Sequence, residues 1–424
     1  MQNTNILKKR SAGEFLLNYA LYIILGAILV GVSIARPNFL KVDNIMQILK
    51  QASTKGILAL GCAGLIVLAG TDLSIGRVLG LSAAVCASLV QRIDYPSRYY
   101  PQMVEQLNPF FLPLLAAVVV AVVISLINGF GVAHLKMHAF IITLGMQLIA
   151  FGANCLYIEG QSAGSAQALA TFDRNFLKIS GGSVVLGDIV LYYVPLILLL
   201  AGILTWVIGN LTPAGKRKLR KLAAGRLVIP FAALYLLAAA VLLWIALGIA
   251  IGASHQAGFL LGSFVVTDVK IPFLVLIFLG IAGIMWVIWN KTRLGKNMFA
   301  VGGNQEAAAV SGVNVARTIM LVYLMAGILY GLASFLEASR IQSVGANTGI
   351  NYETDAISAC VIGGVSFSGG VGTIQGVVIG AIILQAINFS LNFLQINPYL
   401  QYIVRGLIIV LAVAIDVRKY LVKK

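Results

Sequence analysis

Apolar runs long enough to cross a bilayer recur from one end of this chain to the other. A spanning helix needs roughly 20 consecutive apolar residues, and its backbone polar groups must be satisfied within the helix itself. Hydrophobic residues make up 60% of the chain and charged residues 10%, a balance far from that of a soluble domain. The sequence therefore predicts an all-α, polytopic integral membrane protein, with one transmembrane domain over residues 1–424.

The candidate crossings are apolar runs separated by short polar or glycine-rich segments. They cover residues 15–35, 54–70, 74–90, 110–135, 140–158, 189–209, 227–252, 271–289, 318–338, 356–367, 371–393 and 400–417. The run at 356–367 is too short to span the bilayer alone. We expect a broken or re-entrant piece there.

Basic residues outnumber acidic ones, which gives the chain a net charge of +16. When the crossings are threaded with the N-terminus inside, nearly all of this excess falls in cytoplasmic loops, as the positive-inside rule requires. Both termini are then cytoplasmic. The basic charge is thus explained by topology, and a nucleic-acid partner is not expected.

A polar segment at residues 290–317 lies between two long apolar runs and is predicted to face the cytoplasm. Asn304 can cap a short helix over 305–311, whose first turn favours acidic residues and whose end Gly312 can close. The side chains in the body of this helix are small, so another protein surface can approach it closely. We therefore expect a docking helix, and an ordinary loop helix is the alternative. The expected docking residues are Asn304, Gln305, Glu306, Ala307, Ala308, Val310, Ser311 and Gly312.

Two short segments that join apolar runs share a pattern. GTDLSIG at residues 70–76 and GVSFSGG at residues 364–370 both have a polar third position and a serine at the fifth. We call residues 70–76 the first break and residues 364–370 the second break. Helix breaks that recur in the two halves of a transporter indicate its central pathway. The threading places both segments on the cytoplasmic side, so either one of these elements is re-entrant or the similarity is due to chance.

Polar groups at membrane depth are functional candidates because burying them is costly. We expect the translocation pathway to be lined by Asp72, Ser74, Ser368, Asn388 and Asn392, of which the last two share a helix face at i, i+4. Four other ionisable residues are expected at the membrane interface, where water and neighbouring groups satisfy them. These are Glu337, Arg340, Asp355 and Arg405.

Motifs of enzymatic chemistry are missing from the sequence. There is no G-x-x-x-x-G-K-[ST] segment to cradle nucleotide phosphates, and no Ser-His-Asp or carboxylate pair at an informative spacing. His134 and His138 are better explained as a solvated turn than as metal ligands, because no third ligand lies nearby. The chain is therefore not expected to be an enzyme or to hold a cofactor or metal.

Four segments carry a resemblance to a known family. They are GTDLSIGRVLGLSAAV from residue 70, WNKTRLGKNMFAVGGNQEAAAVSGVNV from residue 289, EASRIQSVGANTGINYETDAISACVIGGVSFSGGVGT from residue 337 and NPYLQYIVRGLIIVLAV from residue 397. The sequence resembles the permease subunits of bacterial sugar ABC importers of the ribose, xylose and galactose group.

This resemblance implies a permease of about ten core helices in the inner membrane that moves a monosaccharide inward, with galactose or a methyl-galactoside as the expected sugar. It implies three protein partners: an ATP-binding subunit, a periplasmic sugar-binding protein and a second permease copy. The helix at 305–311 would be the coupling helix that meets the ATPase. Ribose or xylose remain alternative substrates, and an ion-coupled secondary transporter using Asp72 or Asp355 is the alternative mechanism.

Residues 181–270 depart from the family pattern. They hold two extra apolar runs joined by a basic loop, KRKLRKLAAGR, at residues 216–226. An inserted helical hairpin that enters and leaves the membrane preserves the sidedness of all later crossings. The loop is predicted to be cytoplasmic, where it could contact anionic membrane lipid.

Overall fold

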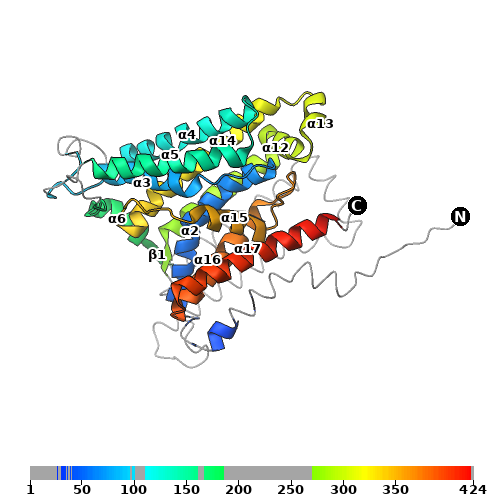
Figure 1. The fold of residues 1–424 in the computed structure, drawn as a ribbon. Coiled ribbons are helices and arrows are strands. Elements are labelled where there is room, and N and C mark those ends of the chain that lie inside the picture. Colours follow the sequence, from blue (N-terminus) through cyan, green and yellow to red (C-terminus); the bar gives the residue numbers. More distant parts are fainter. Residues whose placement is uncertain are drawn as a thin grey trace, which may run out of the picture. The chain divides into compact units, whose positions relative to one another are not determined.

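The computed structural model describes residues 41–95, 98–100, 110–160, 167–185 and 270–421, together with residues 26, 30–34, 36 and 39. Most of these residues are in helices (Figure 1). The helices are α2 Val42–Val67, α3 Ile75–Leu89, α4 Phe111–Ala133, α5 Ala139–Glu159, α6 Arg174–Gly181, α11 Phe273–Lys291, α12 Arg293–Gly303, α13 Gln305–Val310, α14 Val315–Ile341, α15 Tyr352–Ile362, α16 Ile374–Phe393 and α17 Pro398–Leu421.

The chain divides into two units. One unit combines Met1–Gly182 with Phe273–Lys424, and the other is Ser183–Pro272. In the second unit the structure describes only β1 Ser183–Val185 and β2 Lys270–Pro272, which pair antiparallel. The predicted inserted helices and their basic loop lie outside the described residues, as does most of the first predicted crossing.

Five of the described helices are long and apolar enough to cross a membrane: α4, α5, α11, α14 and α16. They differ in how much of their surface is buried. Only 22% of the most apolar window of α5 is buried, whereas 72% of that of α14 is. Large side chains such as Leu148 and Leu156 project from α5 with 67% and 72% exposure. Lipid can solvate such a face, so α5 is a peripheral helix and α14 a central one.

Glycine allows α14 to pack closely on α4, its most extensive partner among the described helices. A Cβ atom at Gly327 would lie 2.8 Å from the Cα of Val122, and one at Gly331 would lie 2.4 Å from the Cα of Val118. The two glycines are spaced i, i+4, which is the small-residue spacing that lets membrane helices approach. Figure 1 shows α4, α5 and α14 side by side.

Helix boundaries agree with the predicted crossings within a few residues except in α2. The crossing predicted at 54–70 begins at Val42 because Asp43, Lys50, Gln51 and Lys55 interrupt the apolar pattern without interrupting the helix. At 356–367, α15 is a single piece of 11 residues, which confirms the short element expected there.

Two amphipathic helices, α6 and α12, are absent from the sequence prediction. Asp173 caps α6 through its Oδ1 atom, which accepts hydrogen bonds from Asn175 N and Phe176 N. Thr292 caps α12 by accepting one from Gly295 N. Two of its glycines, Gly295 and Gly302, are points at which α12 approaches other backbone segments closely.

Candidate functional site

The short helix α13 is capped at both ends by its own sequence. Asn304 Oδ1 accepts a hydrogen bond from Ala307 N at 2.9 Å. At the other end Gly312, at φ +84°, lets its N–H bond to Ala309 O and that of Val313 bond to Ala308 O, both at 3.0 Å. This paired closure is a Schellman motif. The prediction of a capped helix closed by Gly312 is therefore confirmed.

Most of α13 is exposed to solvent. Val310 has 91% of its surface exposed, whereas Ala308 has only 4%. The other exposed members of the expected docking set are Asn304, Gln305, Glu306, Ala307, Ser311 and Gly312. Ala308 faces inward because one side of so short a helix must rest on the protein. A partner would meet Val310 and its neighbours and not Ala308.

Helix α12 links α13 to the two breaks. A Cβ atom at Gly302 would lie 1.8 Å from Val67 O, at the end of α2, and 2.9 Å from Gly370 N, in the second break. Gly370 N also donates a hydrogen bond to Val67 O at 2.8 Å. Three backbone segments therefore meet at Gly302: α12, the second break, and the end of the helix that leads into the first break.

The breaks make the same local turn. In the first, Asp72 Oδ1 accepts a hydrogen bond from Ser74 N at 2.8 Å. In the second, Ser366 Oγ accepts one from Ser368 N at 3.2 Å. In both, the third position of the shared pattern bonds to the backbone of the fifth, as Asx and Ser turns do. The resemblance noticed in the sequence thus corresponds to the same local hydrogen bond in both segments.

The helices that precede the breaks also end alike. Leu65 O and Ile66 O accept hydrogen bonds from Gly70 N and Ala69 N at the end of α2. The corresponding bonds at the end of α15 link Val365 N to Cys360 O and Gly364 N to Val361 O. Gly364 takes φ +80° at the position that closes α15, and Ala69, just before the first break, takes φ +59° at the position that closes α2. The helix ends therefore match Gly364 with Ala69, one residue before Gly70, which is the counterpart of Gly364 in the shared pattern.

A pocket of about 290 Å³ opens beside the first break. It is bordered by Ala69 and Gly70, by Lys136 and His138 in the turn between α4 and α5, and by Gln305 of α13. The first break, the α4–α5 turn and the exposed helix therefore share one hollow. Anything that contacts α13 here also lies next to the first break.

The five pathway candidates fall into separate places. Asp72 and Ser74 are fully buried, and Asn128 of α4 donates a hydrogen bond to Ser74 Oγ at 3.1 Å. Ser368, in the second break, is exposed. Asn388 is buried in α16, whereas Asn392, one turn later, is exposed and accepts a hydrogen bond from Gln401 at 3.0 Å. The shared helix face of the two asparagines does not give them a shared environment.

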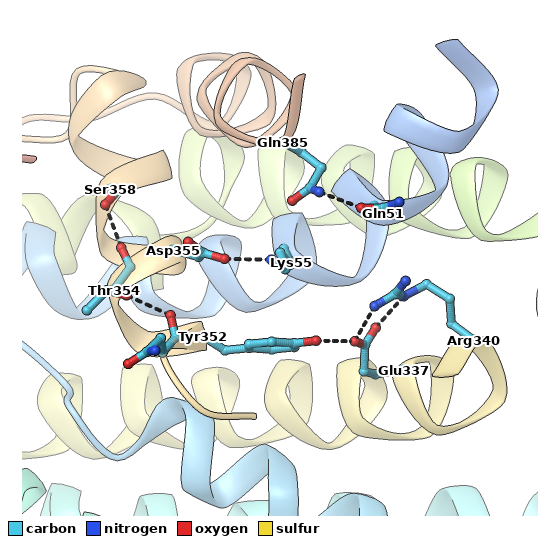
Figure 2. Close-up of polar contacts among 10 residues, drawn as sticks. Gln51, Lys55, Glu337, Arg340, Tyr352, Thr354, Asp355, Ser358 and Gln385 are labelled. Atoms are coloured by element: carbon cyan, nitrogen blue, oxygen red, sulfur yellow. Dashed lines mark hydrogen bonds and ion pairs between the residues drawn. The ribbon is translucent and has the colours of Figure 1, made fainter. Parts of the chain in front are cut away.

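Charged and polar side chains of α2, α14, α15 and α16 meet at a second place in the structure. Figure 2 shows Lys55 of α2 facing Asp355 of α15, with their Nζ and Oδ2 atoms 2.6 Å apart. The same view shows Gln51 of α2 hydrogen-bonded to Gln385 of α16 at 2.6 Å. With Glu337, Arg340 and Tyr352, these residues form what we call the polar cluster.

The other part of the polar cluster is a charge pair with an aromatic cap. Glu337 has none of its surface exposed, and its carboxylate accepts two hydrogen bonds from Arg340, at 2.6 and 2.8 Å. Tyr352 donates its hydroxyl hydrogen to the same carboxylate at 2.5 Å. The neighbouring partner expected for each acid is present for Glu337 and for Asp355. Their placement at the membrane interface stays a prediction. Helix packing buries both acids and supplies each with a cation.

Sequence reasoning named Glu337, Arg340 and Asp355 but missed Gln51, Lys55, Tyr352 and Gln385. The signal for Lys55 was present, because a lysine within a predicted crossing is costly unless it is paired. Its partner is 300 residues away in the sequence. No local pattern identifies such a pair.

The two carboxylates proposed for ion coupling differ in how they are held: the buried Oδ2 atom of Asp72 has no hydrogen-bond partner, whereas Asp355 is in an ion pair. Asp72 Oδ1 is held by the backbone and hydroxyl of Ser74, and Asp355 is paired with Lys55. An acid that is neutralised by a fixed cation is a poor site for a coupling ion. The ion pair with Lys55 therefore argues against Asp355 as a coupling carboxylate.

Comparison with known proteins places the chain in a family. The family model described as the permease component of the branched-chain amino acid transport system matches residues 44–224 and 222–413. The galactose/methyl galactoside import permease protein of Escherichia coli (strain K12) is 37% identical over 418 residues, which cover 99% of each chain.

Two other sugar permeases are more distant. The xylose transport system permease protein of Haemophilus influenzae is 31% identical over 94% of this chain and 95% of its own. The ribose import permease protein of Escherichia coli (strain K12) is 29% identical over 92% of this chain and 90% of its own. No solved structure matches the chain. With its family match, its full-length relatives and its apolar helices, this chain is a multi-pass membrane protein of the permease family, as the four resembling segments indicate.

Proposed function

We propose that this permease is the membrane-spanning subunit of an ABC importer that moves a monosaccharide inward across the inner membrane, with galactose or a methyl-galactoside as substrate. The substrate follows from identity, since the galactose/methyl galactoside import permease is 37% identical and the xylose and ribose permeases are 31% and 29% identical. The permease would work with an ATP-binding subunit, a periplasmic sugar-binding protein and a second copy of itself. Both of its termini would be cytoplasmic.

The observation that carries the coupling mechanism is the mechanical link from α13 to both breaks. A partner seated on exposed Val310 would push on α13, whose neighbour α12 contacts Val67 and Gly370 through Gly302. Packed interfaces transmit such displacements because they have few intermediate arrangements. ATP-driven movement of the partner would thereby shift the breaks against each other.

The breaks and the middle of α16 would line the pathway. Asp72 and Ser74 would form its inner part together with Ser368. Asn388 and Asn392 would contact sugar further along α16. Weak, polar contacts suit a pathway that a substrate must leave as readily as it enters.

The docking role is tested by contrasting one exposed and one buried residue of α13. Val310→Asp places a charge on the exposed face, and an unpaired charge in an interface weakens association by about a hundredfold. The ATPase should no longer co-purify, while the abundance of the permease in the membrane stays normal. Ala308→Glu should instead lower that abundance, because Ala308 is buried in the permease itself.

The substrate is tested by uptake of labelled galactose into vesicles that hold the permease and ATPase, with binding protein supplied at the periplasmic face. We expect ATP-dependent uptake, with unlabelled methyl-galactoside competing better than ribose or xylose. Uptake driven by ribose and indifferent to galactose would overturn the substrate. Galactose uptake driven by an ion gradient without ATPase would overturn the mechanism. If the Val310→Asp variant still co-purified with the ATPase, α13 would be an ordinary loop helix and not the docking site.

A further inference from the structure

Two buried amide side chains on α16 have polar atoms without partners. Asn388 is 1% exposed, and neither its Oδ1 nor its Nδ2 atom makes a hydrogen bond. Gln385 is 3% exposed and lies one turn earlier; its Nε2 donates to Gln51 but its Oε1 is unpaired. Buried polar groups are nearly always hydrogen-bonded, because leaving them unpaired costs free energy. Their persistence in the interior requires an explanation.

These amides continue a line of polar groups through the helices. Gln51 and Lys55 lie one turn apart on α2, and Lys55 pairs with Asp355 of α15 at 2.6 Å. Gln51 is the hydrogen-bond partner of Gln385, which is followed at i+3 by Asn388 on the same face of α16. We call this line of five residues the polar track: Gln51, Lys55, Asp355, Gln385 and Asn388.

The track runs from the middle of the helices away from the breaks. Lys55 is 12 residues before Val67, the end of α2, which is about 18 Å along a helix. Asn388 is 14 residues beyond Ile374, the start of α16 at the second break, or about 21 Å. The track therefore begins about 18 Å from the end of α2 and extends toward the opposite ends of α2 and α16.

We propose that the polar track is the part of the pathway that contacts sugar hydroxyls during transport, with the free amide groups of Asn388 and Gln385 as its principal contacts. This inference rests on the proposed function and adds the ligand chemistry of one site to it. The amide groups stay unpaired in this structure because their partner is the passing substrate.

The chemistry of the free groups fits a polyol better than an ion. Asn388 offers one acceptor and one pair of donors, and Gln385 offers an acceptor. A hydroxyl group both donates and accepts, so adjacent sugar hydroxyls can satisfy all of these atoms at once. A cation would satisfy only the oxygens and an anion only the amide nitrogen. The nearby Lys55–Asp355 pair adds no net charge to attract either.

The test replaces Asn388 by leucine, which is close in size and has no polar group. If the amide contacts only the passing sugar, the substitution should not destabilise the protein without substrate, because it replaces a buried, unpaired polar group by an apolar one. The melting temperature of purified Asn388→Leu should then equal or exceed that of the wild type. Uptake of labelled galactose should fall by about fivefold, the effect of one lost neutral hydrogen bond on a rate. Gln385→Met should behave similarly, with a smaller gain in stability because the bond to Gln51 is lost.

Ser390→Ala is the matched control on α16. Ser390 is also buried, but its hydroxyl bonds only to Ala386 O within its own helix. Galactose uptake by the Ser390→Ala variant should equal that of the wild type. All variants are assayed in vesicles with the ATPase and binding protein, and complex assembly is measured by co-purification.

Three outcomes overturn the polar track. Unchanged uptake by Asn388→Leu would show that the amide does not meet the substrate. A lower melting temperature, with uptake reduced only in proportion to folded protein, would make Asn388 a structural residue. Wild-type vesicles that take up no monosaccharide would refute the proposed function itself, and the polar track with it. If the wild type prefers another sugar, the same comparison is made with that sugar, so that a wrong substrate is distinguished from a wrong site.

Discussion

The two breaks share a turn but differ in how they are held. The first is tied to neighbouring helices by side chains: Asn128 of α4 bonds to Ser74, and Thr143 of α5 accepts a hydrogen bond from Leu73 N at 3.2 Å. The second is held mainly by its own backbone, for example by the bond from Ser366 N to Val371 O at 3.1 Å. Its only described backbone bond to another helix is from Gly370 N to Val67 O.

The backbone of the two breaks differs in the same sense. Gly364, Gly369 and Gly370 all take positive φ in the second break, a region that glycine visits without steric cost. No residue of the first break takes positive φ; Ala69, which directly precedes it, does so and is not glycine. The first break is thus held firmly by neighbouring helices, whereas the second is a glycine-rich loop with more conformational freedom. We infer that the second break is the one that moves when α12 is displaced.

The contact that joins the breaks should be the most sensitive to substitution. Gly302→Ala places a methyl group 1.8 Å from Val67 O, so α12 must move away from both breaks. Overpacking of this kind costs about 1–3 kcal/mol. We expect galactose uptake to fall at least tenfold, and the ATPase to hydrolyse ATP without transport.

Gly303→Ala is its control, because a Cβ atom there meets nothing within 4 Å. It should transport normally. If both variants behave alike, the close approach at Gly302 does not couple α12 to the breaks. Uptake and ATP hydrolysis are measured in the same vesicles.

Removing the side chain that accepts the turn hydrogen bond should lower the stability of the permease more in the first break than in the second. Asp72→Ala leaves Ser74 N without its partner in a fully buried site, which costs about 1–3 kcal/mol. Ser366→Ala removes the weaker acceptor at 3.2 Å and should cost about 0.5–1.5 kcal/mol. Thermal unfolding of the purified permease measures both.

Asp72→Ser sharpens the comparison by giving the first break the side chain of the second. It should recover part of the stability lost in Asp72→Ala, because serine can accept the same backbone hydrogen bond. Equal losses in Asp72→Ala and Ser366→Ala would contradict the view that the first break is the more firmly held of the two.

The smallest effect is expected at Ala69, which closes α2 with φ +59°. The second break has Gly364 at the equivalent place in the turn. Ala69→Gly relieves the left-handed strain but also increases the freedom of the unfolded chain. These terms partly cancel, so the melting temperature should rise by a few degrees at most. A clear fall would mean that the Ala69 methyl group contributes to packing against the second break.

The sequence alone determined the features that depend on neighbouring residues. Apolar runs specify spanning helices because lipid excludes unsatisfied backbone groups, and this determined the all-helical membrane fold. Asn304 and Gly312 closed α13 as predicted, because their bonds reach only three to five residues along the chain. The turn shared by the breaks was visible for the same reason.

Tertiary structure decided which of these residues meet. Ala308 and Val310 are near neighbours in one helix, yet packing buries the first and exposes the second. Asn388 and Asn392 share a predicted face, but only Asn388 is enclosed. The bond from Lys55 to Asp355 spans 300 residues, and that from Gln51 to Gln385 spans 334. Such pairs depend on how whole helices pack, and helix packing is set by close approaches such as those at Gly302 and Gly331, which involve distant parts of the chain.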